Sequence, residues 1–240
     1  MNSAPVVSQA PQSSPKPANE EGVKTGFLPE GMLFARRKSW EALERIAQAI
    51  RPGQLEEEAT ARAQEILREL GSPAFWHRTY VRFGANTLCT YSDQAAPGHR
   101  LGENDIYFID IGPVWENPEE GGARYEGDAG MTGFVGSDPE HAQAAEAVRE
   151  IFEATRQEWK SGARSGKDLY DWMAAETVRR GWILNQKADG HRISEFPHRL
   201  YSTRGIAELD YKPAADIWVL EVQIRHPSRP FGAFYEDILS

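Results

Sequence analysis

Two carboxylates lie in unusually apolar surroundings along this 240-residue chain. Asp110 stands within the run Ile-Tyr-Phe-Ile-Asp-Ile at residues 106–111, and Glu221 within Trp-Val-Leu-Glu-Val-Gln-Ile at residues 218–224. Strands of this composition tend to be covered on both faces, so alternation does not place either carboxylate in water. An unpartnered charge there would be costly. A buried carboxylate usually needs a cation, and a metal ion is one natural candidate.

Three more residues of the same chemistry complete a possible metal site: Asp128 after a glycine, His191 after Gly190, and Glu236 near the end of the chain. Four carboxylates and one imidazole suit Mn, Fe, Co or Zn in a paired site better than a single structural zinc. A water between two such ions becomes a nucleophile near neutral pH. Taken singly, an Asp in a strand more often caps a turn or pairs with Arg, and a His beside Gly is more often a loop residue. The joint order of the five favours the metal.

Composition narrows the class of protein. The formal net charge of -9 disfavours nucleic acid as a partner, because phosphate binding needs a basic surface. Cys89 is the one cysteine, which excludes an intrachain disulfide and a cysteine-based zinc site. No apolar run is long enough to cross a bilayer, and the first residues lack a signal-peptide pattern. We therefore expect a cytoplasmic protein that does not contact membranes.

The positioning elements follow from hydrophobic spacing. Residues 1–25 are rich in Pro, Ser and Gln and predict a disordered tail, followed by one domain over residues 26–240. Apolar residues at helical spacing predict helices over about 40–50 and 55–70, and capping residues predict two more, starting at Asp138 and Ser165. Short β-branched and aromatic runs predict strands at 80–83, 87–91, 106–111, 218–224 and 231–235. Two halves of helix plus strand suit a pseudo-symmetric α+β core.

The order Asp, Asp, His, Glu, Glu resembles that of the methionine aminopeptidase, Xaa-Pro aminopeptidase and prolidase superfamily, the M24 metallopeptidases. The match includes Phe-Ile-Asp-Ile-Gly around Asp110, Gly190-His191 with His198 seven residues later, and Tyr-Glu-Asp around Glu236. It covers about residues 28–240. The resemblance implies the pita-bread fold, a pseudo-symmetric curved antiparallel sheet covered by helices.

The resemblance also implies the chemistry. It makes the chain a dinuclear metal-dependent hydrolase that cleaves an N-terminal peptide or amide bond with a metal-bridged hydroxide. The two divalent ions would be Mn, Co, Zn or Fe, the partner a short peptide or small amide, and the assembly a homodimer. The implied roles are as follows: Asp110 chelates one ion, Asp128 and Glu236 bridge, His191 and Glu221 complete the second ion, Glu221 also shuttles a proton, and His198 donates to the scissile carbonyl or its tetrahedral intermediate.

Departures from the family pattern concern the substrate. Residues 115–122 resemble an inserted loop, and a substrate-contacting His that the family places upstream is absent, with Tyr91 or Ser92 near its position. His77 is a candidate to replace that imidazole, and Arg82 to pair with a substrate carboxylate. The alternative for both is a structural role.

A third departure is Arg192, which follows His191 where the family has a small residue. Three other functions stay open beside the aminopeptidase: a metal-dependent amidase acting on a specialised small molecule, a creatinase-like member that is not a peptidase, and a non-catalytic binding protein. The complete ligand set argues against the last two.

Overall fold

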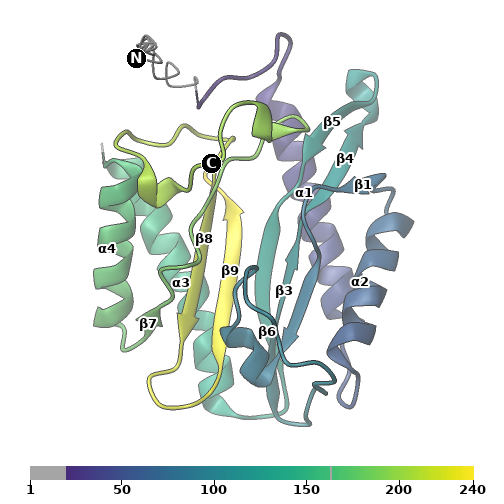
Figure 1. Ribbon diagram of the computed structural model, residues 1–240, viewed down its shortest axis with the longest axis vertical. Helices are drawn as coiled ribbons and strands as arrows, with labels where there is room; N and C mark the ends of the chain where they lie inside the picture. The colour runs from purple at the N-terminus through teal and green to yellow at the C-terminus, as the bar shows by residue number, and fades with distance from the viewer. Residues whose placement is uncertain (1–19, 163) are drawn as a thin grey trace, which may run out of the picture.

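A computed structural model describes residues 20–162 and 164–240 of the chain (Figure 1). Its helices are α1 (Pro29–Ala47), α2 (Glu56–Glu69), α3 (Pro139–Ser161) and α4 (Gly166–Arg179). Its strands are β1 (Ala74–Phe75), β2 (Tyr80–Phe83), β3 (Asp105–Ile111), β4 (Pro113–Asn117), β5 (Ala123–Glu126), β6 (Ala129–Val135), β7 (Ile183–Leu184), β8 (Val219–Arg225) and β9 (Gly232–Ile238).

Six strands form the main sheet, in the order β2-β3-β6-β9-β8-β7, and every pairing is antiparallel. Each half of the chain contributes two helices followed by three strands of this sheet, and the last strands of the two halves, β6 and β9, meet at its centre. The expected pseudo-symmetric α+β arrangement is therefore present. Strands β1, β4 and β5 form a separate three-stranded sheet.

The helices cover one face of the main sheet, with α1 and α3 passing behind it in the view of Figure 1. Ile109 and Ile111 of β3 are buried in one core cluster together with residues of α1 and α2. Leu220 and Val222 of β8 are buried in a second cluster with residues of α3 and α4. Because successive side chains of a strand point to opposite faces, the residues between them project from the face away from the helices.

Two predicted helix starts are confirmed. The Asp138 carboxylate accepts a hydrogen bond from the Glu140 amide at 3.0 Å, and the Ser165 hydroxyl accepts one from the Asp168 amide at 3.1 Å. These side chains satisfy amide groups that a helix start leaves unpaired. The first predicted helix begins earlier than expected, because α1 already starts at Pro29.

The strand predicted at residues 87–91 was wrong. Residues 84–88 form a 3₁₀ turn instead, which begins at Gly84 with a φ of 49° that favours glycine. The Asn86 amide holds the turn by donating to Glu56 and to the Ala96 carbonyl, both at 3.0 Å. Polar contacts to residues distant in sequence therefore outweigh the strand propensity of Thr87 and its neighbours.

The segment 115–122, expected to be an inserted loop, is part of a β-hairpin. Its residues belong to β4, to a turn with Asn117 capping it, and to the approach to β5. Trp115 is buried within the cluster that includes α1, so the hairpin extends the core. The physical reason is that Trp115 and Tyr125 are both buried and lie directly opposite each other on the paired strands.

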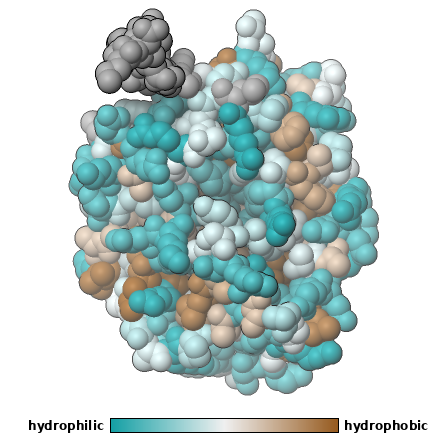
Figure 2. All heavy atoms as spheres, viewed as in Figure 1, coloured by the Kyte–Doolittle hydropathy of each residue, from teal (hydrophilic) through white to brown (hydrophobic). Residues whose placement is uncertain are grey.

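Most of the predicted disordered tail, up to residue 19, lies outside the described residues. From Glu20 onward the structure differs from that expectation, because this segment packs against the region around residues 190–218. The Arg192 guanidinium donates to the carbonyls of Glu20 at 2.9 Å and Gly22 at 2.5 Å. The face shown in Figure 2 is mainly hydrophilic, with apolar side chains interspersed. Among the described helices, none has the length and apolar character to cross a membrane.

Candidate metal centre and active site

Backbone pairing alone aligns three of the candidate residues. Asp110 of β3 lies opposite Gly130 of β6, Gly130 lies opposite Glu236 of β9, and Glu236 lies opposite Glu221 of β8. Directly opposed residues of neighbouring strands point to the same face. The three carboxylates therefore form one row across four strands, on the face away from the helices. Gly130 leaves the middle of the row without a side chain.

Asp128 joins this row from the position just before the start of β6. It stands two residues before Gly130, so it shares the side of the strand from which the row projects. Asp128 and Glu236 are only 2% and 1% exposed. Among the described residues, Asp128 Oδ2, Asp110 Oδ1 and Glu236 Oε1 are buried and have no hydrogen-bonding partner. Buried carboxylate oxygens without partners are costly unless a cation neutralises them, so these residues fit divalent metal ions.

His191 brings its imidazole to one side of the row. Gly190 precedes it, and a Cβ at that position would lie 2.2 Å from the Val219 carbonyl oxygen, so only glycine allows this approach to β8. The Nε2 atom of His191 lies 3.2 Å from Asp128 Oδ2, 3.5 Å from Glu236 Oε1 and 3.8 Å from Glu221 Oε1. The structure thus brings together all five predicted metal-binding residues.

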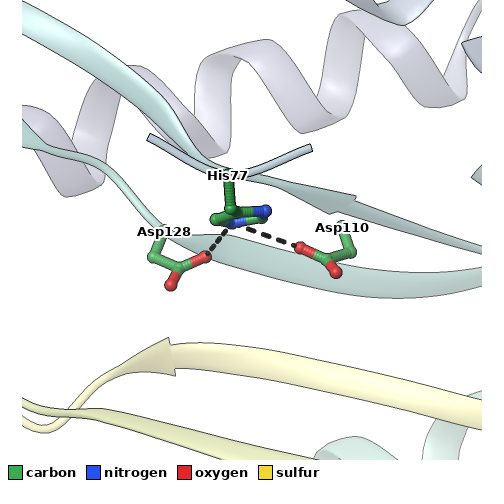
Figure 3. A group of neighbouring side chains, drawn as sticks. All are labelled: His77, Asp110 and Asp128. Atoms are coloured by element: carbon green, nitrogen blue, oxygen red, sulfur yellow. Dashed lines mark hydrogen bonds and ion pairs between the residues drawn. The ribbon is translucent and has the colours of Figure 1, made fainter. Parts of the chain in front are cut away.

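His77 approaches Asp110 and Asp128 from the segment between β1 and β2 (Figure 3). Its Nε2 atom lies 3.2 Å from Asp128 Oδ1 and 3.7 Å from Asp110 Oδ1. Two clusters that could each hold an ion therefore share Asp128: one with His77 and Asp110, the other with His191 and Glu236.

The crowding of these charges alters their acidity. Burial raises the pKa of Asp110 and of Glu221 to about 7, in each case against the opposing effect of a nearby imidazole. Burial also raises the pKa of Glu236 well above its usual value, and the charge on Asp128 adds to this. For Asp128 itself burial is outweighed by His77 and His191, which lower its pKa. Without a metal the site holds protons in place of cations.

His198 lies next to the metal-binding residues but outside both clusters. Its amide and its Nδ1 both contact the Glu126 carboxylate, at 2.9 and 2.7 Å. The imidazole and the carboxylate are buried, with 6% and 1% of their residues exposed. An ionised carboxylate accepts hydrogen bonds and cannot donate them. Glu126 therefore fixes a proton on Nδ1 of His198 and leaves Nε2 without a contact to this carboxylate.

Trp76 packs between the imidazoles of the site. Its ring makes edge contacts with His77, His191 and His198, with centroids 4.4, 5.2 and 5.1 Å apart. Its indole nitrogen donates to the Gly127 carbonyl at 2.8 Å, which ties it to the turn before Asp128. Its position between the rings orders three histidines.

The predicted substrate-binding residues other than His77 lie around the site. Arg82 donates to Glu56 at 3.0 Å and lies over the Tyr80 ring at 4.9 Å. Its charge is therefore already paired, and its pairing with a substrate carboxylate stays a prediction. Tyr91 is 72% exposed and stands at the rim of the pocket.

The site opens into a pocket of about 330 Å³. Its floor includes His77, Asp110, His191, Glu221 and Glu236, and its walls carry both signs of charge. The wall residues with ionisable side chains are Tyr80, Tyr91, Lys187, Asp189, Arg199 and Glu208. A short polar chain can thus reach the carboxylate row from solvent.

Glu126 is the residue of the site that the sequence analysis missed. The signal available was its position two residues before Asp128. Its partner His198 is 72 residues away in sequence, so the pairing could be found only in three dimensions.

Comparisons with known proteins agree with this geometry. The model of metallopeptidase family M24 matches residues 30–237. The structure is similar to that of the X-Pro aminopeptidase from Thermotoga maritima MSB8, with a TM-score of 0.68 and 20% identity over 88% of this chain and 60% of that one. The prolidase from Pyrococcus furiosus gives a TM-score of 0.67 and 18% identity, over 87% of this chain and 59% of that one.

A shorter protein is matched over nearly its whole length. The methionine aminopeptidase from Thermotoga maritima has a TM-score of 0.67 and 18% identity, over 90% of this chain and 94% of that one. By contrast, this chain spans about three fifths of the X-Pro aminopeptidase and prolidase chains. A search of the curated proteins found no match. The predicted pita-bread fold is confirmed.

Proposed function

This chain belongs to metallopeptidase family M24, and we propose that it is a dinuclear metal-dependent hydrolase that removes the N-terminal residue of a short peptide. One observation carries the proposal: a row of carboxylates, three of whose oxygens are buried and lack a partner among the described residues, lies at the floor of an open pocket. When bound there, two divalent ions would acidify a water and polarise the scissile carbonyl.

The metal-binding roles follow the distances. Asp110 and Asp128 face one position, and His191 and Glu236 face a second, with Asp128 between the two. Glu221 lies opposite Glu236 in the row and completes the second position. The resemblance additionally makes Glu236 a bridging ligand, and these roles stay predictions.

Protein side chains would carry out the proton transfer and stabilise the developing negative charge. Glu221 would take a proton from the attacking water and deliver it to the departing amine as the C–N bond breaks. His198 in its imidazolium form, with Nδ1–H held by Glu126, would donate its Nε2–H to the carbonyl oxygen as negative charge develops there. The predicted metals, the homodimer and the cytoplasmic location stay predictions.

Metal dependence and substrate can be tested together. We expect the purified protein to hold close to two transition-metal ions, to lose them on Asp110→Ala or Glu236→Ala, and to hydrolyse peptides only when loaded. The panel contains peptides beginning Xaa-Pro, peptides beginning with Met, and controls blocked at the amino terminus. Unchanged hydrolysis by demetallated protein would overturn the proposal.

A second candidate is a metal-dependent amidase for a small molecule. It is favoured by Tyr91, which stands at the pocket rim where the family pattern has an imidazole. Amino-acid amides added to the same panel separate the two, because an amidase would hydrolyse them and leave peptides intact.

A further inference from the structure

The imidazole of His77 belongs to the metal centre although it is outside the ligand set that the resemblance implies. We propose that His77 is a sixth metal ligand, which binds the ion shared by Asp110 and Asp128 through Nε2. Each ion would then have one imidazole. This inference rests on the proposed dinuclear site and adds a ligand to it.

The first support is distance. Ligand atoms bound about 2.1 Å from one ion lie about 3.0–3.4 Å from each other. His77 Nε2 lies 3.2 Å from Asp128 Oδ1 and 3.7 Å from Asp110 Oδ1. On the other side of the site, His191 Nε2 has the same range of distances, 3.2 to 3.8 Å, from its carboxylates. Each imidazole is therefore placed as it would be if it shared an ion with its own neighbouring carboxylates.

The second support is the orientation of the ring. His77 Nδ1 lies 2.7 Å from the carbonyl oxygen of Arg78, which can only accept, so Nδ1 carries a proton. His191 repeats the arrangement, with Nδ1 at 3.2 Å from the carbonyl oxygen of Arg192. A carbonyl that accepts from one ring nitrogen fixes the tautomer and directs the other nitrogen to a metal.

The third support is the space reserved for the ring. A Cβ at Gly112 would lie 2.0 Å from Cδ2 of His77, so a side chain at this position would displace the imidazole. The Trp76 ring also contacts His77 edge-on, with the ring centroids 4.4 Å apart. The imidazole thus packs against both the Gly112 backbone and the indole, with Nε2 near the carboxylates.

One competing arrangement is an imidazolium that occupies the place of the first ion. Nε2 of His77 is within hydrogen-bonding distance of Asp128, so a doubly protonated ring would satisfy both contacts. Asp110 distinguishes the two arrangements, because its Oδ1 is 3.7 Å from Nε2 and is buried without a partner among the described residues. A hydrogen bond to Asp128 alone leaves that oxygen unsatisfied, whereas an ion between the three groups satisfies it.

The test is a Co²⁺ titration of demetallated protein, followed by visible absorption and by equilibrium dialysis with elemental analysis. We expect two ions per chain for the wild type. In His77→Ala and His77→Gln the dissociation constant of one ion should rise at least about tenfold, since losing even an outer partner of a ligand costs about 10–100-fold. The absorption of that ion should change as well. His226→Ala is the matched control, because its imidazole is likewise mostly buried but pairs with Glu140.

The outcomes separate the inference from the proposed function. Two ions with unchanged affinity and spectrum in both His77 variants would overturn the ligand and leave the dinuclear hydrolase standing. One ion in the wild type and two in His77→Ala would show that the imidazole replaces an ion, which also overturns it. No metal in the wild type would overturn both the His77 ligand and the proposed dinuclear hydrolase. Circular dichroism of the demetallated variants excludes misfolding as the cause of a lost ion.

Discussion

At the scale of single residues, the site depends on a carboxylate that does not face the row. Glu126 contacts the amide and Nδ1 of His198 and the amide of Ser194 at 3.1 Å. Replacing it with glutamine offers an NH₂ group where Nδ1–H needs an acceptor. The imidazole would then be expected to change tautomer or orientation.

Glu126→Gln should therefore lower kcat about 10–100-fold while metal content and KM stay near wild type. Steady-state kinetics with elemental analysis of the same preparation measures this. Glu116→Gln serves as control, because that glutamate forms an exposed pair with Arg124, and such pairs contribute little. A normal kcat in Glu126→Gln would show that His198 acts without this partner.

Gly112 offers a way to move His77 without altering its chemistry. Since a Cβ at this position meets the imidazole at 2.0 Å, Gly112→Ala should displace the ring and weaken one of the two ions, as His77→Ala does. The Co²⁺ titration measures the effect. Gly102→Ala is the control, because a Cβ there has ordinary contacts of 3.6 Å or more. Full metal affinity in Gly112→Ala would place His77 outside the metal centre.

The residues that could be predicted from sequence are those whose surroundings are local. Asp110 and Glu221 could be recognised because their own strands are apolar. Asp128, His191 and Glu236 could be recognised because the five residues follow each other in the order of the family's ligands. The metal-side position of His77 could not be predicted, because it depends on the pairing of β1 with β4, which brings residue 77 to Gly112. The pairing of Glu126 with His198 could not be predicted either, because the two residues are distant in sequence.

At the scale of elements, the carboxylate row follows from strand register. Asp110, Gly130, Glu236 and Glu221 are directly opposed through three consecutive pairings. A shift of one residue in any of these strands would turn its carboxylate toward the helices. Helix starts were predictable from Asp138 and Ser165, whose caps are local. The turn at residues 84–88 was not, because Glu56 of a distant helix holds it.

The composition of the segment from Glu20 to Lys24 predicted disorder, but in the structure this segment is held by hydrogen bonds and an ion pair. Its hydrogen bonds and its ion pair come from residues 170 to 197 positions later in the chain. The main chain of residues 20–22 accepts from Arg192, the Glu20 carboxylate pairs with Arg204 at 3.1 Å, and the Glu21 carboxylate accepts from the Ala214 amide at 2.7 Å. Burial lowers the pKa of Arg192, which is 1% exposed, so its guanidinium relies on these carbonyls.

Removing residues 1–25 should therefore destabilise the fold by about 3 kcal/mol, because two donors of a buried guanidinium lose their acceptors. Removing residues 1–19 is the matched control, since it leaves those acceptors in place. Urea unfolding of the metal-free proteins compares the free energies of unfolding. Equal stability of the two truncated proteins would show that water replaces the segment at no cost.

At the scale of the whole molecule, the buried site couples folding to protons. In the metal-free protein burial raises the pKa of Asp110 and Glu221 to about 7, whereas in the unfolded chain such carboxyls titrate near about 4. Between these values the folded state binds more protons than the unfolded state. The free energy of unfolding therefore falls as pH rises through this window.

His77 acts in the same direction. Burial lowers its pKa, but the charges of Asp110 and Asp128 outweigh this and raise it to about 9, against about 6.5 in the unfolded chain. Its stabilising contribution is present in full below the lower value and is lost as pH rises through the higher one. Asp128 acts in the opposite direction, but its lowered pKa confines its effect to acid pH.

Metal ions and these protons compete for the same atoms, which makes the stabilisation by metal depend on pH. At about pH 6 an added ion must displace protons from Asp110, Glu221 and His77, and at about pH 8.5 it displaces fewer. The increase in Tm that a fixed Co²⁺ concentration produces over chelator-treated protein should therefore grow from the lower pH to the higher. Thermal unfolding at several pH values measures it, with Asp110→Asn/Glu221→Gln as the variant in which the increase itself should largely vanish. An increase in Tm that is equal at both pH values would mean that the ions bind away from the carboxylate row.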